Sequence, residues 1–190
     1  MQSIVPPIVV IGTMALDDVR TPFGAVKRAL GGSATFASLG CALFEKPGIV
    51  SVVGEDFPTE HIQLLQEKGI NTQGIEIKKS EKTFHWEGEY GMDLNDAKTI
   101  QTDLNVIEHF NPKLPETFRE SPYLFLGNFS PDVQLNVLKQ MKKRPKFVVA
   151  DSMNFWITSK RDDVIELIRN VDIFLLNEIE ARQLFNTSNL

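Results

Sequence analysis

This sequence contains very little cysteine. Its 190 residues include a single one, Cys41, which excludes an intrachain disulfide and a metal site built from several cysteines. Cys41 lies in a stretch of small residues with no basic partner nearby in the sequence, so we interpret it as core filler and not as a nucleophile. A reducing, cytoplasmic location is the expectation that follows.

Long apolar runs and an excess of basic charge are also missing. No stretch approaches the roughly 20 apolar residues that span a bilayer. The start, MQSIVPPIVVIG, has neither a charged n-region nor a small-residue cleavage site, so no signal peptide is expected. The net charge of -5 does not favour nucleic acid or an anionic membrane as a partner. The composition, 42% hydrophobic and 24% charged, is that of an ordinary soluble domain.

Several motifs of known chemistry are absent as well. The three histidines, His61, His85 and His109, have no metal-ligand spacing, and the sequence contains no G-x-S-x-G. The diglycine Gly31-Gly32 belongs to neither a Walker A loop nor a dinucleotide fingerprint, because the remaining spacing fails. No internal repeat is visible.

An alternation of buried strands and helices organises most of the chain. Apolar β-branched runs predict strands, and apolar residues at helical spacing predict helices. The predicted strands are 8–11, 49–53, 123–126, 147–150 and 173–176, and the predicted helices are 34–44, 61–68, 131–141, 162–168 and 178–185. This order predicts an α/β fold with a mostly parallel central sheet flanked by helices, in which ligands bind at the carboxyl ends of the strands.

The segment at about 72–106 departs from this alternation. It contains no long helical pattern, and its strand-like pieces are 72–77, 82–90 and 99–106. Phe84, Trp86 and Tyr90 are spaced to share one face of a strand. We interpret the segment as a small antiparallel sheet inserted into the α/β chain.

Polar residues follow the predicted strands, where a ligand is expected. They are Asp17, Asp56, Asn128, Asp151 and Asn177. Each one also suits the first turn of a helix as a capping residue, and that alternative stays open. A carboxylate such as Asp17 accepts hydrogen bonds from two hydroxyl groups, which suits recognition of a polyol.

Two short segments favour oxygen-rich ligands. Glycines at 31 and 32, before a predicted helix, let a ligand approach the backbone and the free N–H groups of the helix. A simple tight turn is the alternative. Asn177 and Glu180 have the spacing of a capping box; the functional alternative is that Glu180 orders water around Mg²⁺, which keeps several waters.

In this order, the segments resemble those of the ribokinase-like, or PfkB, carbohydrate kinases. VVIG at 9–12, leading to Asp17, is similar to the family's first strand and its sugar-binding aspartate. GGSATFA at 31–37 resembles the first half of the N-terminal signature, and VVGEDF at 52–57 resembles the VGxDxFG turn. NEIE at 177–180 matches the N-x-x-E motif.

The resemblance implies an α/β sandwich with a small β lid that closes over a sugar and excludes water. The lid would consist of the strands around 82–90 and 99–106, joined by the segment near 18–23. It also implies ATP as the phosphate donor, Mg²⁺ as cofactor, a small-molecule sugar as substrate and a possible homodimer through the lid. The implied substrate residues are Asp17, Gly31, Gly32, Ser33 and Asn128. The implied nucleotide and phosphate residues are Asn177, Glu180, Asp151 and Asn154, with Glu180 acting on Mg²⁺ through water.

The sequence departs from the family pattern at positions implied to bind the sugar and the phosphates, and at the catalytic base. Phe36 stands where the family usually has Asn. The segment 151–156 keeps the Asp and Asn of a D-x-N-x-R stretch as Asp151 and Asn154, one residue further apart, and Trp156 stands at the Arg position two residues after Asn154. The second signature, D-T-x-G-A-G-D, whose last Asp is the family's catalytic base, is not found in these residues. We therefore expect the base beyond Leu190, and an incomplete domain at 1–190 that supplies the sugar site and the N-x-x-E motif of a longer kinase.

Three alternatives stay open. The chain is a catalytically inactive fragment that binds sugar or dimerises through its lid, or it is part of a nucleoside kinase of the same fold. A Rossmann-type nucleotide-binding protein is the third alternative. It predicts a glycine-rich first turn, which GTMA at 12–15 does not supply.

Overall fold

The computed structural model describes residues 5–94 and 97–188. Predictions that concern the first four residues, the pair 95–96 or the last two residues lie outside this part. The elements in chain order are β1 (Ile8–Ile11), β2 (Ala15–Thr21), β3 (Gly24–Gly31), α1 (Ser33–Cys41), β4 (Gly48–Gly54), α2 (Thr59–Glu67), β5 (Asn71–Lys78), β6 (Phe84–Tyr90), β7 (Ala97–Asp103), η1 (Asn105–Ile107), η2 (Phe118–Glu120), β8 (Tyr123–Leu126), α3 (Pro131–Gln140), β9 (Phe147–Asp151), α4 (Asn154–Ser159), α5 (Arg161–Asn170), β10 (Ile173–Leu175) and α6 (Glu178–Phe185).

A six-stranded sheet in the order β10-β9-β8-β1-β4-β5 forms the centre of the molecule. All five of its strand pairs are parallel, so the predicted mostly parallel sheet is confirmed. The chain begins in the middle at β1, adds β4 and β5 on one side, and then adds β8, β9 and β10 on the other. The strand order therefore reverses at β1, where α/β sheets of this kind open a crevice for ligands.

Helices flank the sheet on both faces. α1 and α2 pack on one face of β1 and β4, where Val10, Ile49 and Leu65 are fully or almost fully buried. α3 and α5 pack on the other face, behind β8 to β10, around Val148 and Leu167. Continuous apolar runs form these strands because both of their faces can be covered.

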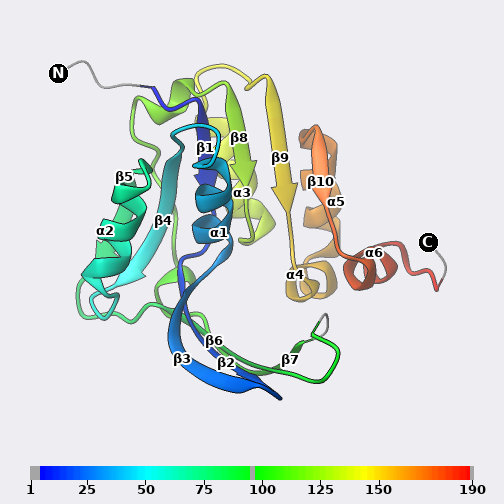
Figure 1. The fold of residues 1–190 in the computed structure, drawn as a ribbon. Coiled ribbons are helices and arrows are strands. Elements are labelled where there is room, and N and C mark those ends of the chain that lie inside the picture. Colours follow the sequence, from blue (N-terminus) through cyan, green and yellow to red (C-terminus); the bar gives the residue numbers. More distant parts are fainter. Residues whose placement is uncertain (1–4, 95–96, 189–190) are drawn as a thin grey trace.

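A second sheet, in the order β3-β2-β6-β7, lies beyond the carboxyl ends of the central strands (Figure 1). We call it the lid. Its strands come from residues 15–31 and 84–103. The segment near 18–23, which the family resemblance assigns to the lid, lies in the first half, and the strands expected around 82–90 and 99–106 correspond to β6 and β7 in the second half. β2 and β6 pair in parallel, so the lid is not wholly antiparallel as predicted.

The strand predicted at 72–77 is not part of the lid. It forms β5, which pairs in parallel with β4 at the edge of the central sheet. Its side chains are only partly buried, like those of a strand with one solvated face, and this pattern made it look like part of a small separate sheet. β2 and β3 were not predicted as strands, because charged residues interrupt their apolar pattern; only the family resemblance placed the segment near 18–23 in the lid. α4, with six residues, was also missed.

Among the described residues, no helix has the length and apolar character needed to cross a membrane.

Candidate functional site

Asp17 and Gly31 lie together at the base of the lid. They occupy the adjacent antiparallel strands β2 and β3, where Ala15 pairs with Gly31 and Asp17 pairs with Ala29. The Asp17 carboxylate leans over the glycine: a Cβ atom on residue 31 would come within 1.9 Å of Asp17 Oδ2. The structure therefore brings together two of the predicted substrate residues, and residue 31 must stay small to keep the carboxylate in place.

The pKa of Asp17 is raised to about 6. Burial is the main cause; the nearby charge of His85 opposes it, and the charge of Asp18 adds to it. Near neutral pH the side chain is a carboxylate that lost part of its hydration on folding. Such a group gains by accepting hydrogen bonds from ligand hydroxyls.

Thr13 joins the end of β1 to the start of α1. Its backbone N–H donates to Ser33 Oγ at 3.0 Å, and the Ser33 N–H donates to Thr13 Oγ1 at 3.1 Å. Gly32 has a φ of 97°, and a Cβ there would lie 2.3 Å from the Thr13 carbonyl oxygen. The tight turn is therefore present, and the Ser33 hydroxyl is engaged with Thr13. A substrate role for Gly32 and Ser33 stays a prediction.

A cavity of about 200 Å³ lies between the lid and the ends of the central strands. Its lining is mainly apolar and aromatic: Thr13, Phe84, Thr102, Leu104, Ile107, Asn128, Met153, Phe155 and Trp156. Strand register places Asp17 beside Trp86, and Trp86 beside Thr102, on the lid face that also carries Phe84. Asp17 therefore belongs to the lid face that forms one wall of this cavity.

Asn128 follows β8 and has its side chain fixed by two neighbours. The Trp156 indole N–H donates to Asn128 Oδ1 at 3.1 Å, and Asn128 Nδ2 donates to the Met153 sulfur at 3.1 Å. A thioether is a weak acceptor and the amide carries two N–H groups. Asn128 can therefore still donate a hydrogen bond to a molecule in the cavity.

Gln134, which sequence reasoning did not single out, fixes the ends of β8 and β9. This fully buried side chain of α3 donates to the carbonyl oxygens of Leu126, Gly127 and Asp151 at 2.8, 3.1 and 3.0 Å. The only sequence signal was a Gln in the predicted 131–141 helix. These hydrogen bonds hold Asp151, and Asn128 next to Gly127, at the same edge of the central sheet.

Asp151 and Glu180 form an acidic pair beyond β9 and β10. The pKa of Asp151 is raised to about 7, mainly by burial and also by the nearby charge of Glu180. Burial also raises the pKa of Glu180. Asp151 Oδ1 is buried and has no hydrogen-bond partner within the described ranges. A cation placed between these carboxylates would offset the cost of their charge.

The capping box predicted as an alternative at Asn177 and Glu180 is present. Asn177 Oδ1 accepts from the Glu180 N–H at 2.8 Å, and Glu180 Oε2 accepts from the Asn177 N–H at 3.0 Å. The box leaves Glu180 near Asp151, so capping and a phosphate or metal role are compatible. Asn154 is exposed at the start of α4, where its side chain accepts from the Phe155 N–H at 2.9 Å.

The donor set suits Mg²⁺ held mainly through water. In residues 5–94 and 97–188, no group of three or more His, Cys, Asp or Glu side chains is arranged to hold a metal directly. Mg²⁺ commonly keeps several waters and contacts only one or two carboxylates. Asp151 and Glu180 fit that pattern, since they are two carboxylates, one of which has an oxygen that is unpartnered among the described residues.

Asp56, another polar residue after a strand, holds the base of the lid. Asp56 Oδ1 accepts from the Thr83 N–H at 2.7 Å and from the Thr83 hydroxyl at 2.8 Å. The Arg28 guanidinium of β3 donates to the Asp56 carbonyl oxygen at 2.8 Å. These contacts join both halves of the lid to the loop after β4.

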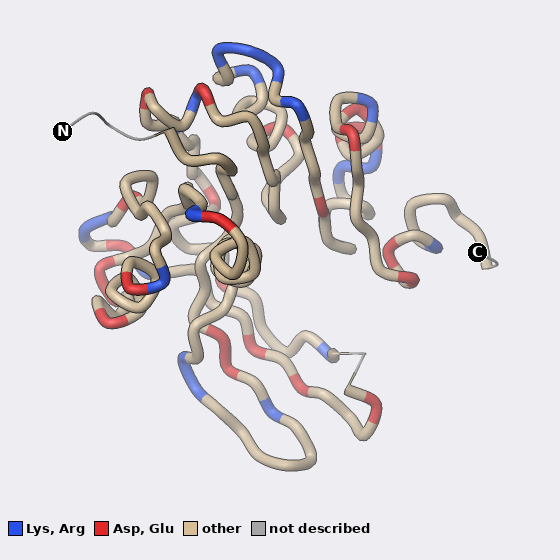
Figure 2. Tube along the Cα trace, turned by 45° about the horizontal axis from the view of Figure 1, so that its top comes forward, with Lys and Arg blue, Asp and Glu red and all other residues tan. Residues whose placement is uncertain are grey.

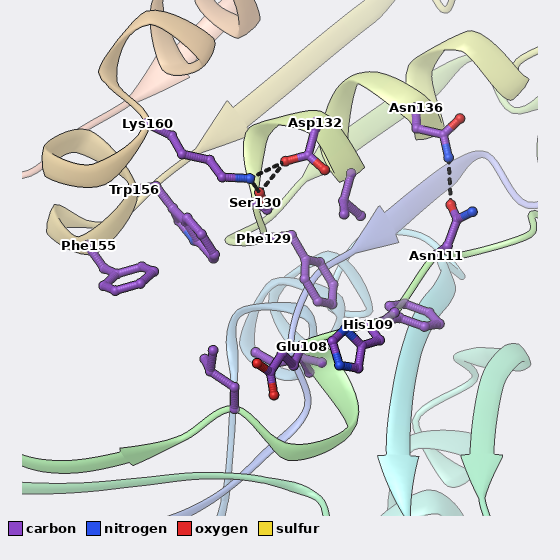
Figure 3. Close-up of a pocket in the computed structure, with 14 residues that line it drawn as sticks. Glu108, His109, Asn111, Phe129, Ser130, Asp132, Asn136, Phe155, Trp156 and Lys160 are labelled. Carbon is purple, nitrogen blue, oxygen red and sulfur yellow. Dashed lines mark hydrogen bonds and ion pairs between the residues drawn. The ribbon is translucent and has the colours of Figure 1, made fainter.

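A second, larger cavity of about 580 Å³ adjoins the first, and Trp156 and Phe155 line both (Figure 3). Lys160 Nζ lies 5.6 Å from the centre of the Trp156 ring. It donates hydrogen bonds to Ser130 Oγ and Asp132 Oδ1, each at 2.7 Å. Trp156 is thus held by Asn128, Lys160 and an edge contact with Phe155.

Figure 2 shows that the basic loop between α3 and β9 lies at the opposite end of the strands from the lid, whose strands carry several acidic residues.

Comparisons with known proteins agree with this architecture. No protein-family model matches the chain. A cytidine kinase of Thermococcus kodakarensis is 27% identical over 177 residues, covering 92% of this chain and 62% of that protein. The solved nucleoside kinase of Methanocaldococcus jannaschii, described as an archaeal member of the ribokinase family, has a TM-score of 0.75 at 18% identity and covers 99% of this chain.

The ribokinase of Cryptococcus neoformans, solved with ADP, has a TM-score of 0.77 at 16% identity and covers 98% of this chain. The chain spans 62% of the cytidine kinase, 66% of the nucleoside kinase and 62% of the ribokinase, less than two thirds of each. At these identities the solved structures establish the fold, and the fold class predicted from the sequence is confirmed.

Proposed function

We propose that this chain, which has the ribokinase-like fold, forms the acceptor-binding part of an ATP-dependent kinase that phosphorylates a hydroxyl group of a nucleoside. The observation that carries the proposal is the aromatic cavity of about 200 Å³ under the lid, one wall of which is the lid face that also carries Asp17. A nucleoside joins a planar aromatic base, whose faces can stack on aromatic side chains, to a sugar rich in hydroxyls. The aromatic cavity suits the base, and the Asp17 carboxylate suits the sugar.

The lining of the cavity favours a base over a second sugar. Phe84, Phe155 and Trp156 offer ring faces and edges for stacking, which suits a planar ring. A sugar in the same place would lose hydration from several hydroxyls without enough partners, which is costly. Asn128 remains available to donate to a ring nitrogen or carbonyl oxygen.

Each part of the site has a role in this scheme. Asp17 accepts hydrogen bonds from sugar hydroxyls and so orients the ring, while Gly31 leaves room for the carboxylate. Asp151 and Glu180, further along the same edge, would hold nucleotide phosphates and hydrated Mg²⁺. Bound Mg²⁺ would supply positive charge to the phosphates. The lid excludes water from the substrate.

A simple sugar is the second candidate, because the ribokinase neighbour with ADP has the same fold. The two candidates differ in what the aromatic cavity does. If the substrate is a sugar alone, the cavity stays unused, and changes at Trp156 should leave affinity almost unaltered.

Isothermal titration of the 190-residue chain with cytidine, adenosine, inosine, ribose and fructose tests the proposal. We expect at least one nucleoside to bind about tenfold or more tightly than ribose, and Asp17→Asn to weaken it. Equal binding of ribose and all nucleosides would favour the sugar candidate, and no binding by any of them would reject the acceptor site. A coupled ADP-release assay on the same panel should show no turnover by this chain alone, because no residue in it is assigned as the base.

Two further elements belong to the same proposal. A homodimer through the lid is supported by its exposed apolar side chains, among them Phe23 and Met92, which are 74% and 77% exposed. A cytoplasmic location is supported by the single cysteine and by the requirement for ATP. Sedimentation of the wild-type chain and of Phe23→Glu tests the dimer, which the substitution should weaken.

A further inference from the structure

Basic residues are concentrated in one short loop between α3 and β9. Lys142, Lys143, Arg144 and Lys146 are four of the 20 lysines and arginines of a chain whose net charge is -5. We call residues 142–146 the basic loop. It lies at the end of the strands opposite the lid (Figure 2), so it is separate from the acceptor and phosphate sites proposed above. Like charges this close together repel one another, and the repulsion costs free energy unless anions offset it.

The basic loop borders a cavity of about 450 Å³. The residues that line the cavity are Glu120, Ser121, Pro122, Lys142, Lys143, Arg144, Pro145 and Lys146. Four of these side chains are basic and one is acidic, and no aromatic side chain of the described residues is among them. The volume is typical of a small-molecule site. The excess of positive charge favours an anion as its ligand.

Backbone hydrogen bonds fix both ends of the basic loop. The Lys142 N–H donates to the Arg119 carbonyl oxygen at 2.9 Å, and the Lys146 N–H donates to the Pro122 carbonyl oxygen at 2.8 Å. Between them Pro145 is buried, and its ring restricts the backbone further. The loop therefore holds its side chains around the cavity before a ligand binds, and little backbone entropy remains to be lost on binding.

Acidic groups of the chain compensate only part of this charge. Lys142 forms ion pairs with Glu116 and Glu120, each at 2.6 Å. Arg144 donates to the Asn170 carbonyl oxygen and to the Asp172 carboxylate, each at 3.0 Å. Because a guanidinium has five N–H donors, Arg144 keeps donors for a ligand.

Lys143 and Lys146 carry the uncompensated charge. Both residues are exposed, and neither side chain has an ion pair or a hydrogen bond with the residues that the structure describes. Two ammonium groups and part of one guanidinium therefore remain available at the cavity. A bound anion would relieve the repulsion between them.

These groups favour phosphate over other anions. Lys binds phosphate as a point charge, and Arg binds it with parallel N–H groups. A lone carboxylate has one charge for two separate lysines, whereas linked phosphates carry several charges in a row. The lining offers no ring on which a base could stack, which disfavours single-stranded nucleic acid. The loop itself has no exposed large apolar side chain that could enter a membrane.

We propose that the basic loop is a binding site for a soluble oligophosphate, a molecule with at least two linked phosphate groups. Lys143 and Lys146 supply the charge, and Arg144 supplies directed N–H donors. Lys142 stays paired with its two glutamates. The site lies at the opposite end of the strands from Asp17, Asp151 and Glu180, and it does not depend on the proposed kinase activity.

Isothermal titration of the 190-residue chain with inorganic tripolyphosphate tests the proposal. The buffer is freed of divalent cations, so that no metal can hold the probe at the acidic pair of Asp151 and Glu180. We expect one site with a dissociation constant below about 100 μM, and binding of orthophosphate that is at least about tenfold weaker. Raising NaCl to about 0.5 M should weaken the binding, because the site is exposed and salt screens it.

Two double variants locate the site. Lys143→Gln with Lys146→Gln should weaken tripolyphosphate at least about tenfold. Lys46→Gln with Lys68→Gln removes the same charge from exposed residues outside the loop, and this matched control should bind within about twofold of the wild type. All four positions are exposed, so both variants should keep the fold, which thermal unfolding without ligand measures.

Four results would overturn the proposal. The first is no binding of tripolyphosphate, and the second is an equal loss in the two double variants. Equal affinity for sulfate and tripolyphosphate is the third, since it shows only a general attraction of anions. The fourth is tighter binding of a labelled single-stranded RNA or of phosphatidylserine vesicles, lost in the loop variant, which would identify a macromolecular partner instead. Failure to bind any nucleoside or sugar rejects the proposed function alone.

Discussion

The Asp17 carboxylate lies directly against Gly31, on the neighbouring strand of the lid. A Cβ atom at residue 31 would approach Asp17 Oδ2 to 1.9 Å. The glycine therefore acts on the carboxylate through space, and the two residues form one unit of the site. Gly31 is therefore needed for the space it leaves to the Asp17 carboxylate, whereas an ordinary turn glycine is needed for its backbone conformation.

Gly31→Ala should displace Asp17 and weaken nucleoside binding about tenfold or more, because the new methyl group occupies the space of the carboxylate. Isothermal titration with the best-binding nucleoside measures the change. Gly91→Ala is the control, since a Cβ there meets nothing within 4 Å. If Gly31→Ala binds as well as the wild type, the carboxylate does not contact the substrate from its present position.

The affinity for nucleoside should fall as pH decreases through about 6. Burial holds the pKa of Asp17 at about 6, so below that value the group is protonated and loses acceptor capacity. Titrations between pH 5 and 8 should show this fall in the wild type, and Asp17→Asn should bind weakly with little pH dependence. A flat profile in the wild-type chain would remove Asp17 from substrate recognition.

Trp156→Phe should weaken nucleoside binding about three- to tenfold, because it keeps a ring but loses the N–H that orients Asn128. Trp156→Ala should weaken it further. Ribose binding should hardly change in either variant. Phe185→Ala, at a residue that is 60% exposed on α6, is the control and should bind normally. Equal losses for ribose and nucleoside would show that Trp156 supports the fold and not the base.

The free energy of unfolding should decrease as pH rises from about 4 to 8. The pKa of Asp151 is about 7 in the folded chain, above its ordinary value of 3.8. A raised carboxyl pKa favours the folded state while the group is protonated, and this contribution is lost as pH increases through 7. Asp151→Asn should remove part of the dependence and stabilise the chain at pH 8 by about 2 kcal/mol.

Denaturant unfolding at several pH values checks this expectation, with Asp162→Asn on α5 as a surface control. A stability that rises steadily from pH 4 to 8 in the wild type, or no difference for Asp151→Asn at pH 8, would contradict it.

The central sheet could be predicted because most of its strands are short, continuous apolar runs in the sequence. Ile8–Ile11 and Tyr123–Leu126 begin and end where the sequence predicts. The lid could be predicted only in part. Its strands are exposed on much of their surface, so Asp18, Arg20 and Lys27 interrupt the period that marks a strand. β5 was misplaced for a related reason, since an edge strand and a lid strand have similar half-buried patterns.

The site was predictable where a residue type carries its own chemistry. Asp17 and Gly31 were assigned together through the family resemblance, and the fold brings them into contact. Gln134 and Thr13 were not predictable, because their roles depend on which carbonyl and which serine the fold places beside them. The aromatic cavity was hidden for the same reason: Phe84 and Trp156 are far apart in the sequence and line one cavity only in the folded chain.

The lid is assembled from two stretches of chain that are separated by the β4–α2–β5 part of the core. Residues 15–20 of β2 pair with residues 84–89 of β6, so the parallel pair closes a long loop. Long-range parallel pairing is slow, because the loop entropy is lost before the contacts form. During synthesis the β2–β3 hairpin would therefore lack its partner strand β6 until the segment between the two halves of the lid has been synthesised. The timing of lid formation is thus built into the order of the strands.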